Sequence, residues 1–307
     1  MRVLITGVGG FVGMRLARHL LARGDRVSGT YIDAVPVMDG EIMEGVELHE
    51  ADILNRSALE RAMRSAKPDA IVNLAGLSHI GESWDWQRMS DYYWVNVAGT
   101  ENVLAAAAAC GNPPVVIASS GDVYGTVPES EQPIPESHPV APQTPYALTK
   151  AAAERIAAAH SAVIVRSFNL IGPGQAPKFA LASWASQLAA IRRGERPPVL
   201  EVGDLSTARD FIHVDDGAEA YRLLAETGER GSVYNLASGQ AVTMAEALKR
   251  LLAISGVEAE VKEGAYPPRP FDIPRLSGDA GRLRALGWAP RRTLDDALQD
   301  IWRDFGF

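Results

Sequence analysis

A glycine-rich turn near the N-terminus constrains the fold of this chain more than any other feature. The turn, Thr6 to Gly13, follows an apolar run from Arg2 to Ile5 and precedes a helical stretch from Arg15 to Ala22. Three of its glycines recur at every third position, where they permit a tight turn and let backbone N–H groups at the helix N-terminus approach an anion. A strand, such a turn and a helix in this order predict a phosphate-binding loop, although a glycine-rich connection without a ligand is the alternative.

Short apolar runs and helical stretches alternate along the first half of the chain. Continuous apolar runs fit strands that are buried on both faces, and strand-helix alternation implies right-handed crossovers in a parallel sheet. The expected strands are Arg2–Ile5, Ala70–Leu74, Val115–Ala118 and Val163–Val165, and the expected helices are Arg15–Ala22, Ala58–Met63, Val95–Ala109 and Ala147–Ala159. This pattern predicts an α/β fold with a doubly wound parallel sheet of the Rossmann type.

The regular alternation weakens in the second half of the chain. We expect a dinucleotide-binding domain over residues 1–168, a later segment near 204–238 that crosses back to it, and a smaller lobe over residues 169–307 that mainly binds the substrate. The helices expected in this half are Ala180–Arg192, Asp216–Ala225 and Met244–Ile254.

Composition and charge exclude several classes of protein. Apolar residues make up 47% of the chain and charged residues 22%, which is typical of a globular protein and not of a disordered one. No apolar run approaches the roughly 18 to 20 residues that span a bilayer, and Met1 leads directly into a strand, so we expect a cytoplasmic protein without a signal peptide or membrane partner. The single cysteine, Cys110, excludes an internal disulfide and a cysteine-based metal site. A net charge of −8 argues against binding of nucleic acid.

Tyr146 and Lys150 are candidates for proton transfer. They are four residues apart in a helical stretch, which places both on one face of the helix. A tyrosine is a poor acid or base at neutral pH, but a neighbouring ammonium group favours the phenolate and is expected to lower the pKa of Tyr146. Ser120 follows the strand expected over Val115–Ala118, so its hydroxyl is expected at the same edge of the sheet, where it would hydrogen-bond a substrate carbonyl.

Each of these features has a structural alternative when taken alone. A tyrosine and a lysine on an exposed helix are usually structural, and a serine at a strand end often serves only the turn. Together, in this order and at these strand ends, Gly7 to Gly13, Ser120, Tyr146 and Lys150 resemble the extended short-chain dehydrogenase/reductase family over nearly the whole chain. The resemblance implies an oxidoreductase with catalytic Ser120, Tyr146 and Lys150, an NAD(P)H cofactor and no metal.

The resemblance also implies a set of cofactor-binding residues. Asp33 is expected to hold the adenosine ribose, although it could instead cap a turn, because the acid of many NAD-binding relatives falls where Tyr31 stands. No arginine that would accept a 2′-phosphate is nearby, so the choice between NAD and NADP stays open. The full expected set is Gly7, Gly10, Phe11, Val12, Gly13, Asp33, Asp52, Ile53, Leu74, Ala75, Gly76, Asn96, Tyr146, Lys150 and Phe168.

On the substrate side, the motifs Arg166–Gln175, Glu201–Asp216 and Arg269–Pro274 resemble those of nucleotide-sugar enzymes. A guanidinium group matches the paired oxygens of a phosphate, so Arg209 and Arg269 are expected to clamp a diphosphate. The full expected set of substrate-binding residues is Ser78, Ser120, Asp122, Tyr146, Asn169, Arg209 and Arg269. Leu170 departs from the pattern, since many relatives carry a histidine there.

Within this family the motifs are most similar to those of GDP-4-keto-6-deoxy-mannose reductases, which make GDP-D-rhamnose. The resemblance implies reduction of a C4 ketone on a nucleotide-linked sugar, most simply a GDP-sugar, by a homodimer. A 4,6-dehydratase is a rival, but related dehydratases carry an acidic pair where this chain has Gly121 and Asp122. A C4 epimerase and a redox sensor without catalytic activity are further alternatives, although a sensor does not need a proton relay.

Overall fold

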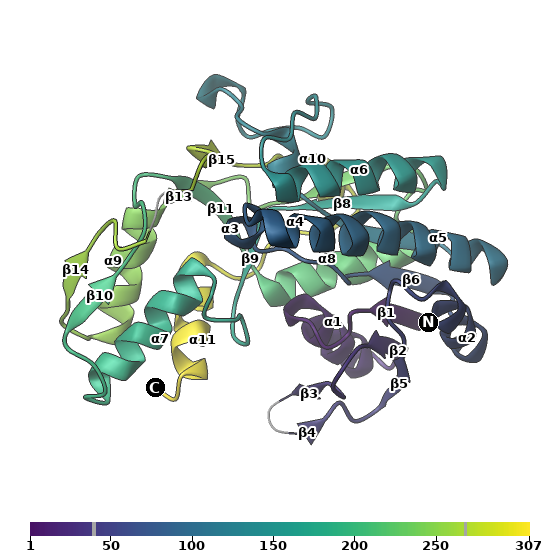
Figure 1. Ribbon diagram of the computed structural model, residues 1–307, viewed down its shortest axis with the longest axis horizontal. Helices are drawn as coiled ribbons and strands as arrows, with labels where there is room; N and C mark the ends of the chain where they lie inside the picture. Colours follow the sequence, from purple (N-terminus) through teal and green to yellow (C-terminus); the bar gives the residue numbers. More distant parts are fainter. Residues whose placement is uncertain (39–40, 267–268) are drawn as a thin grey trace.

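The computed structural model describes residues 1–38, 41–266 and 269–307, and its centre is a seven-stranded parallel sheet (Figure 1). The strand order is β12-β8-β7-β6-β1-β2-β5, and all neighbouring strands run parallel. The strands of this sheet are β1 (Arg2–Thr6), β2 (Arg26–Tyr31), β5 (Val46–Glu50), β6 (Ala70–Asn73), β7 (Val115–Ser120), β8 (Val163–Ser167) and β12 (Val233–Leu236). The expected doubly wound α/β fold is therefore confirmed.

Alternation along each strand explains the two hydrophobic layers of this domain. Successive side chains point to opposite faces of a sheet. Val3 and Ile5 accordingly belong to one buried cluster, whereas Leu4 belongs to the other, and Val116 and Ile117 divide in the same way. Both faces are covered, which is why these strands read as continuous apolar runs in the sequence.

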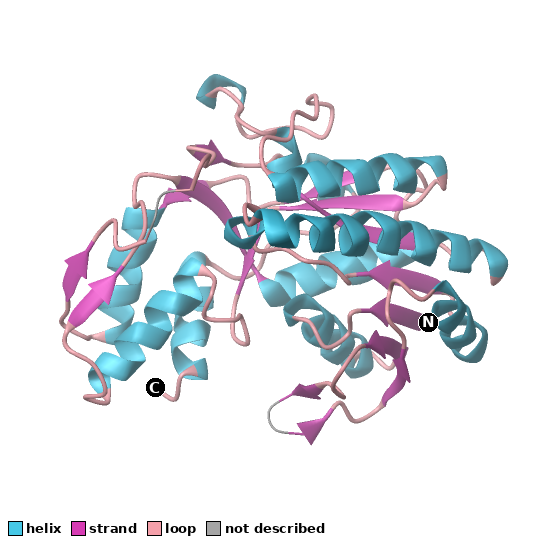
Figure 2. Cartoon of the chain, viewed as in Figure 1, coloured by secondary structure: helices cyan, strands magenta, loops and turns pink. Residues whose placement is uncertain are grey.

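Helices cover both faces of the sheet (Figures 1 and 2). On one face lie α1 (Phe11–Ala22) and α8 (Val214–Thr227), and on the other lie α2 (Arg56–Ala66), α5 (Gly99–Ala109) and α6 (Pro145–Ala159). The helix expected over Val95–Ala109 begins earlier than the sequence indicated, because α4 (Trp86–Tyr93) continues through the π-helical turn η1 (Trp94–Ala98) into α5. The short helices of this domain are α3 (Ile80–Ser83), η2 (Gly121–Tyr124), η3 (Glu129–Glu131) and α10 (Gly281–Ala285).

A smaller lobe packs around a third hydrophobic cluster, at the left of Figure 1. Its helices are α7 (Ala180–Arg192), α9 (Met244–Ser255) and α11 (Leu294–Asp304). The remaining strands are β3 (Val37–Met38), β4 (Glu41–Ile42), β9 (Asn169–Ile171), β10 (Val199–Glu201), β11 (Ala208–His213), β13 (Ala241–Thr243), β14 (Glu260–Lys262) and β15 (Arg275–Leu276). Between the β11 and β13 strands that border the lobe, the chain returns to the large sheet through α8 and β12.

The strand order fixes where a ligand binds. From β1 the chain winds outward through β2 and β5, and after α2 it crosses back to β6 and winds the other way through β7, β8 and β12. In an open parallel sheet the ligand lies beyond the carboxyl ends of the strands at the point where the winding reverses. That point is between β1 and β6.

None of the described helices is long and apolar enough to cross a membrane.

Candidate active site

The glycine-rich turn connects β1 to α1 at the reversal point of the sheet. Gly7 has a positive φ of 70°, and a Cβ atom at this position would lie 2.8 Å from the Cα of Ala75. A Cβ atom at Gly13 would overlap the carbonyl oxygen of Gly7. Because Gly10 caps α1 without a side chain, no side-chain cap covers the N–H groups of the first turn. A backbone cradle of this form fits the diphosphate of a dinucleotide.

The carboxyl ends of β1 and β6 are joined beneath this cradle. Thr6 Oγ1 donates a 2.6 Å hydrogen bond to Asn73 Oδ1, and Leu74 N donates to Thr6 O at 3.2 Å. Leu74 and Ala75 are half-buried, and Gly76 is exposed. A Cβ atom at Gly76 would lie 3.0 Å from Asn96 Oδ1 and 3.3 Å from Lys150 Nζ. The segment Leu74 to Gly76, which the sequence predicted to bind the cofactor, therefore ends beside the candidate catalytic residue Lys150.

The expected cofactor-binding residues Asp33, Asp52 and Ile53 follow the neighbouring strands β2 and β5. Asp33 is exposed and has a positive φ of 65°, just beyond β2. Asp52 is also exposed, and its carboxylate accepts a 2.8 Å hydrogen bond from Leu54 N, so it caps a turn. Ile53 is buried, and a Cβ atom at Gly99 would lie 2.9 Å from it. Of the other expected cofactor contacts, Phe11 and Val12 are half-buried in the first turn of α1, beside the diphosphate cradle.

Tyr146 and Lys150 lie in the first turns of α6, on the face that packs against the end of β7. Thr144 caps this helix through a 3.1 Å hydrogen bond from Ala147 N, and Pro145 occupies the first turn, where a missing N–H group has no cost. Lys150 Nζ donates to Ala118 O at 2.9 Å and lies 6.0 Å from the centre of the Tyr146 ring. Both side chains are buried.

Ser120 ends β7 and caps the η2 turn that follows it. Its hydroxyl group donates a 2.8 Å hydrogen bond to Asp122 Oδ2 and accepts one of 3.2 Å from Asp122 N. The Ser120 side chain is also hydrogen-bonded to the Tyr146 hydroxyl group, and this bond lowers the pKa of Tyr146. The structure thus brings together the three residues that the sequence proposed as catalytic, with Asp122 beside them.

Burial dominates the proton affinities of this group. The pKa of Tyr146 lies well above its usual value because the phenol is buried and Asp122 is near, so the expected lowering by Lys150 is not found in the free protein. Burial also lowers the pKa of Lys150 to about 8, an effect that the charge of Glu154 opposes. Tyr146 is therefore a protonated phenol at neutral pH, which is the form that an acid requires.

Asn96 supports this group from the π-helical turn η1. Its amide donates hydrogen bonds of 3.0 Å to Leu77 O and to Thr149 Oγ1, and its oxygen accepts a 2.9 Å hydrogen bond from Leu77 N. Thr149 Oγ1 in turn donates to Tyr146 O at 2.8 Å. Turns of this type often occur at functional sites, and here the turn directs the amide between α6 and the cofactor strand.

The two candidate clamp arginines meet at one carboxylate. Arg209 Nη2 lies 2.5 Å from Asp272 Oδ1, and Arg269 Nη1 lies 3.1 Å from Asp272 Oδ2. Arg209 also donates to the carbonyl groups of Ala208 and Ile273, at 2.9 Å and 2.7 Å, which fixes its guanidinium group. Arg209 and Arg269 lower the pKa of Asp122 through their charges, against a larger effect of burial that raises it. The two arginines are therefore close enough for their charges to act on Asp122, beside the candidate catalytic residue Ser120.

The other expected contacts lie around this centre. Phe168 is buried, and a Cβ atom at Gly121 would lie 3.0 Å from its ring. Asn169 is exposed on β9 and pairs with Phe211, whereas Ser78 is exposed before α3.

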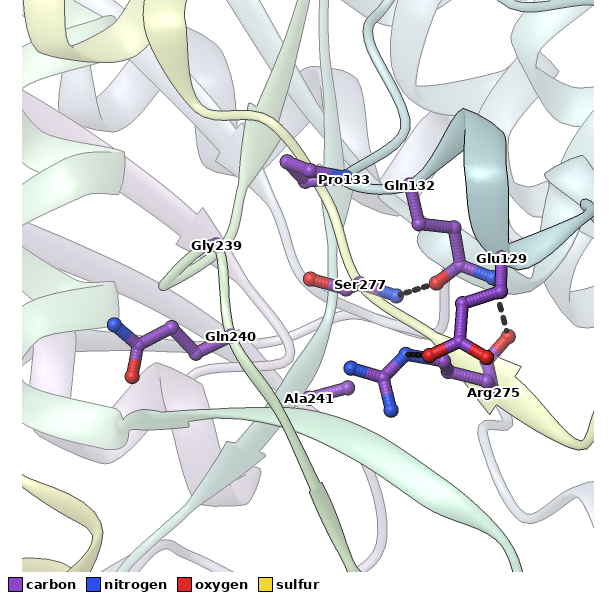
Figure 3. Close-up of a pocket in the computed structure, with 8 residues that line it drawn as sticks. All are labelled: Glu129, Gln132, Pro133, Gly239, Gln240, Ala241, Arg275 and Ser277. Atoms are coloured by element: carbon purple, nitrogen blue, oxygen red, sulfur yellow. Dashed lines mark hydrogen bonds and ion pairs between the residues drawn. The ribbon is translucent and has the colours of Figure 1, made fainter.

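A pocket outside this centre has a volume of about 410 Å³ (Figure 3). Its lining residues are Glu129, Gln132, Pro133, Gly239, Gln240, Ala241, Arg275 and Ser277. The Gln132 amide already donates to Val127 O and Arg275 O, and its oxygen accepts from Ser277 N. Arg275 pairs with Glu129 at 3.4 Å. Gln132, Arg275 and Ser277 thus already bond to one another or to nearby groups of the protein. None of the expected catalytic residues lines this pocket.

Sequence reasoning missed three residues that organise the site. Asp272 holds both arginines, and the Glu154–Arg166 pair lies behind Lys150 with nitrogen-oxygen distances of 2.9 Å and 2.7 Å. A signal for Glu154 was available, since it is the one acidic residue in the alanine-rich stretch after Lys150 and falls four residues further along the same helix face. Arg166 and Asp272 fall inside the motifs Arg166–Gln175 and Arg269–Pro274, but nothing in those motifs indicated the ion pairs that they form.

The fold and the candidate site indicate the class of dinucleotide-dependent enzymes, with Ser120, Tyr146 and Lys150 grouped at the carboxyl end of β7. Residues 3–237 match the model of the NAD dependent epimerase/dehydratase family. The chain belongs to this family. The expected NAD(P) cofactor and the expected activity of an NAD(P)-dependent oxidoreductase are confirmed at the level of the family.

Individual relatives cover the full length of the chain. GDP-6-deoxy-D-mannose reductase of Pseudomonas aeruginosa is 35% identical over 312 residues, which cover 99% of this chain and 97% of that protein. The structure of RMD from Pseudomonas aeruginosa complexed with NADPH is similar with a TM-score of 0.84 and 33% identity, and 99% of each chain is covered. UDP-glucose 4-epimerase of Thermus thermophilus, in complex with NAD, has a TM-score of 0.87 and 30% identity, again over 99% of each chain.

Proposed function

We propose that this protein reduces the C4 ketone of GDP-4-keto-6-deoxy-D-mannose to give GDP-D-rhamnose. The observation that carries the proposal is the surroundings of Gly121, between Ser120 and Asp122. A Cβ atom there would lie 3.0 Å from the Phe168 ring, which is tighter than an ordinary contact, so this position carries no acidic side chain and an added one would have to displace that ring, whereas a dehydratase needs a second acid to expel the C6 hydroxyl group. The likeness to a GDP-6-deoxy-D-mannose reductase of the same length supports the same reading.

In this proposal the protein's own residues move the proton and hold the ketone. When bound, NAD(P)H supplies the hydride that reaches C4 and is oxidised as the ketone is reduced. The Tyr146 hydroxyl group donates its proton to the oxygen at C4, which completes the alcohol. Ser120 donates a hydrogen bond to the same oxygen and stabilises the charge that develops there. Lys150 holds the cofactor ribose and provides positive charge close to Tyr146.

We assign the diphosphate of the substrate to Arg209 and Arg269. Their guanidinium groups are held close together by the Asp272 carboxylate, and each has further donors for phosphate oxygens. Asn169 and Ser78 are exposed and are proposed to contact the substrate between the clamp and Ser120. In this arrangement the overall charge of −8 does not oppose binding, because the anion meets cations and helix N–H groups at short range.

We also propose a homodimer, formed through an exposed apolar patch of Trp86, Met89, Tyr93, Trp94 and Leu148. Trp86 is 78% exposed and Trp94 and Leu148 are each 55% exposed, which is unusual for such large apolar side chains. Trp86, Met89 and Tyr93 recur along one face of α4, which packs beside α6. Replacing Trp94 and Leu148 by lysine is expected to convert a dimer into a monomer in analytical ultracentrifugation; a monomeric unmodified protein would refute the proposal.

The function is tested by incubating the purified protein with NADH or NADPH and several nucleotide-linked 4-keto-6-deoxy sugars. Loss of absorbance from the reduced cofactor, with GDP-D-rhamnose as the product, is the expected result. Turnover without net loss of added cofactor would instead indicate a dehydratase or an epimerase. Binding of cofactor without turnover of any sugar would indicate a sensor.

A further inference from the structure

Two residues on one face of α6, Lys150 and Glu154, contact two consecutive residues of β7. Lys150 Nζ donates to Ala118 O at 2.9 Å, and Ser119 Oγ donates to Glu154 Oε1 at 2.5 Å. The next residue of the strand is the catalytic candidate Ser120. Lys150 and Glu154 therefore fix the position of the helix relative to the strand end that carries the active-site hydroxyl group.

The carboxylate of Glu154 is shared with a buried arginine on the neighbouring strand β8. Arg166 lies opposite Ser119 in the register of β7 and β8, and its Nε and Nη2 atoms lie 2.9 Å and 2.7 Å from the two oxygens of Glu154. The two side chains are only 7% and 8% exposed. Since little water can screen these charges, they act on their neighbours more strongly than a surface pair would.

Few other charged or titratable groups face the Tyr146–Lys150 pair. Within α6 the group is Glu154, and Arg166 of β8 lies behind it, paired with its carboxylate. From η2 it is Asp122, and burial raises its pKa. From α4 and α8 the groups are Tyr92 and Tyr221, and burial raises the pKa of each to about 12, so both are neutral at physiological pH. The far side of Arg166 faces the ring of Tyr124, 4.8 Å away, and the carbonyl group of Glu136.

We propose that Glu154 and Arg166 are a positioning pair that holds Lys150 at the end of β7, beside Tyr146, and balances the buried charge around it. The proposal rests on the assignment of Tyr146 and Lys150 as the proton-transfer residues in the proposed function. Glu154 attracts the Lys150 ammonium group, and the ion pair that Arg166 forms with both oxygens of Glu154 weakens that attraction. Without Arg166, Lys150 would hold its proton more tightly; without Glu154, it would release its proton more easily.

The sign of the effect differs between the two halves of the pair. In Glu154→Gln the guanidinium group of Arg166 stays charged, which disfavours protonated Lys150 and favours the phenolate of Tyr146. In Arg166→Gln the negative charge of Glu154 is uncompensated and has the opposite effect on both groups. Because Lys150 and Tyr146 respond in the same direction, the expected sign does not depend on which of them titrates first.

The test is a direct titration of Lys150 in the free protein by nuclear magnetic resonance. The chain has only five lysines, so ¹³C-labelled lysine gives few signals, and Lys150→Met identifies the signal of interest. In the unmodified protein we expect a pKa of about 8 for Lys150. Glu154→Gln is expected to lower it by about 0.5 to 1 pH unit and Arg166→Gln to raise it by a similar amount. The titration needs no sugar, so failure of the proposed substrate would leave its outcome intact.

Three further variants keep the test decisive. The double variant Glu154→Gln with Arg166→Gln leaves no unpaired buried charge, and it is expected to fold and to titrate close to the unmodified protein. Arg166→Lys is expected to restore most of the balance. Glu246→Gln, which breaks an exposed ion pair with Arg250, is the matched control and is expected to have no effect. Shifts in the same direction for both single variants, or no shift in folded single variants, would overturn the proposal.

If the proposal holds, the alkaline limb of the pH profile of kcat for sugar reduction moves in the same directions as the Lys150 titration. A purely structural role for the pair would reduce stability in both single variants and leave that limb in place.

Discussion

The Ser120 hydroxyl group donates a hydrogen bond to the carboxylate of Asp122, with an oxygen-oxygen distance of 2.8 Å. In the free protein, the Ser120 proton that would hydrogen-bond a substrate ketone is therefore already donated to Asp122. A bound ketone has to take this hydrogen bond from Asp122. Asp122 thus competes with the substrate for Ser120, a role that differs from that of a base in a dehydratase.

This relationship leads to a prediction for Asp122→Ala. Because Tyr146 donates the proton in a reductase, we expect kcat for the 4-keto sugar to change by less than about tenfold in this variant, whereas loss of a true acid or base costs about a hundredfold or more. The measurement is steady-state reduction followed by cofactor absorbance. A loss of two orders of magnitude in a folded variant would place Asp122 among the proton-transfer residues.

Tyr146→Phe separates binding from chemistry. The phenol ring stays in its buried position, so the cofactor is expected to bind with unchanged affinity, while turnover falls by about 10² to 10⁴. Fluorescence titration with the reduced cofactor measures the first quantity and steady-state kinetics the second. Unchanged reduction of the sugar by this variant would exclude Tyr146 as the acid.

The sequence was sufficient for the parallel-sheet fold class and four of its strands, for the position of the glycine-rich turn between β1 and α1, and for the grouping of Ser120, Tyr146 and Lys150. These follow from local rules: a run of buried residues makes a strand, and a spacing of four residues places two side chains on one helix face. The pKa of Tyr146 could not be predicted in this way. A neighbouring lysine can be read from the sequence, but the burial that outweighs its effect depends on how α6 packs against the sheet.

The same limit applies to residues that act through distant partners. Asp272 joins Arg209 to Arg269 across a separation of 63 residues from Arg209, and no periodic pattern connects them. The helix start at Trp86 was missed for a related reason, because the π-helical turn at Trp94–Ala98 interrupts the regular period of the helix.

The two clamp arginines are expected to differ when truncated. Arg269 is largely on the surface, so Arg269→Ala should raise KM for the sugar nucleotide by about tenfold or more, leave KM for the cofactor unchanged and have little effect on stability. Arg209→Ala should raise KM for the sugar nucleotide further, but it also removes two hydrogen bonds to backbone carbonyl groups. It is therefore expected to lower the free energy of unfolding by about 1 to 3 kcal/mol.

The matched control for the clamp is Arg193→Ala, which removes an exposed arginine that pairs with its near neighbour Glu195. We expect this variant to behave as the unmodified protein. Equal increases in KM for cofactor and sugar in Arg269→Ala would mean that the arginine supports the fold and does not contact the diphosphate.

Lys150 is expected to reduce the stability of the free protein. Burial lowers its pKa from 10.5 to about 8, so the folded state binds the lysine proton more weakly than the unfolded state does. Below pH 8 both states are protonated and the whole cost of burying the charge is present, and between pH 8 and 10.5 that cost disappears as folded Lys150 becomes neutral. Lys150→Met removes the charge and is expected to raise the free energy of unfolding at pH 7 by about 1 to 3 kcal/mol, with the lost hydrogen bond to Ala118 included. The measurement is urea denaturation of the unmodified protein and of Lys150→Met, without cofactor, at pH 7 and pH 10. The increase in the free energy of unfolding should be smaller at pH 10. An increase that is equal at both pH values would show that it comes from packing and not from the charge.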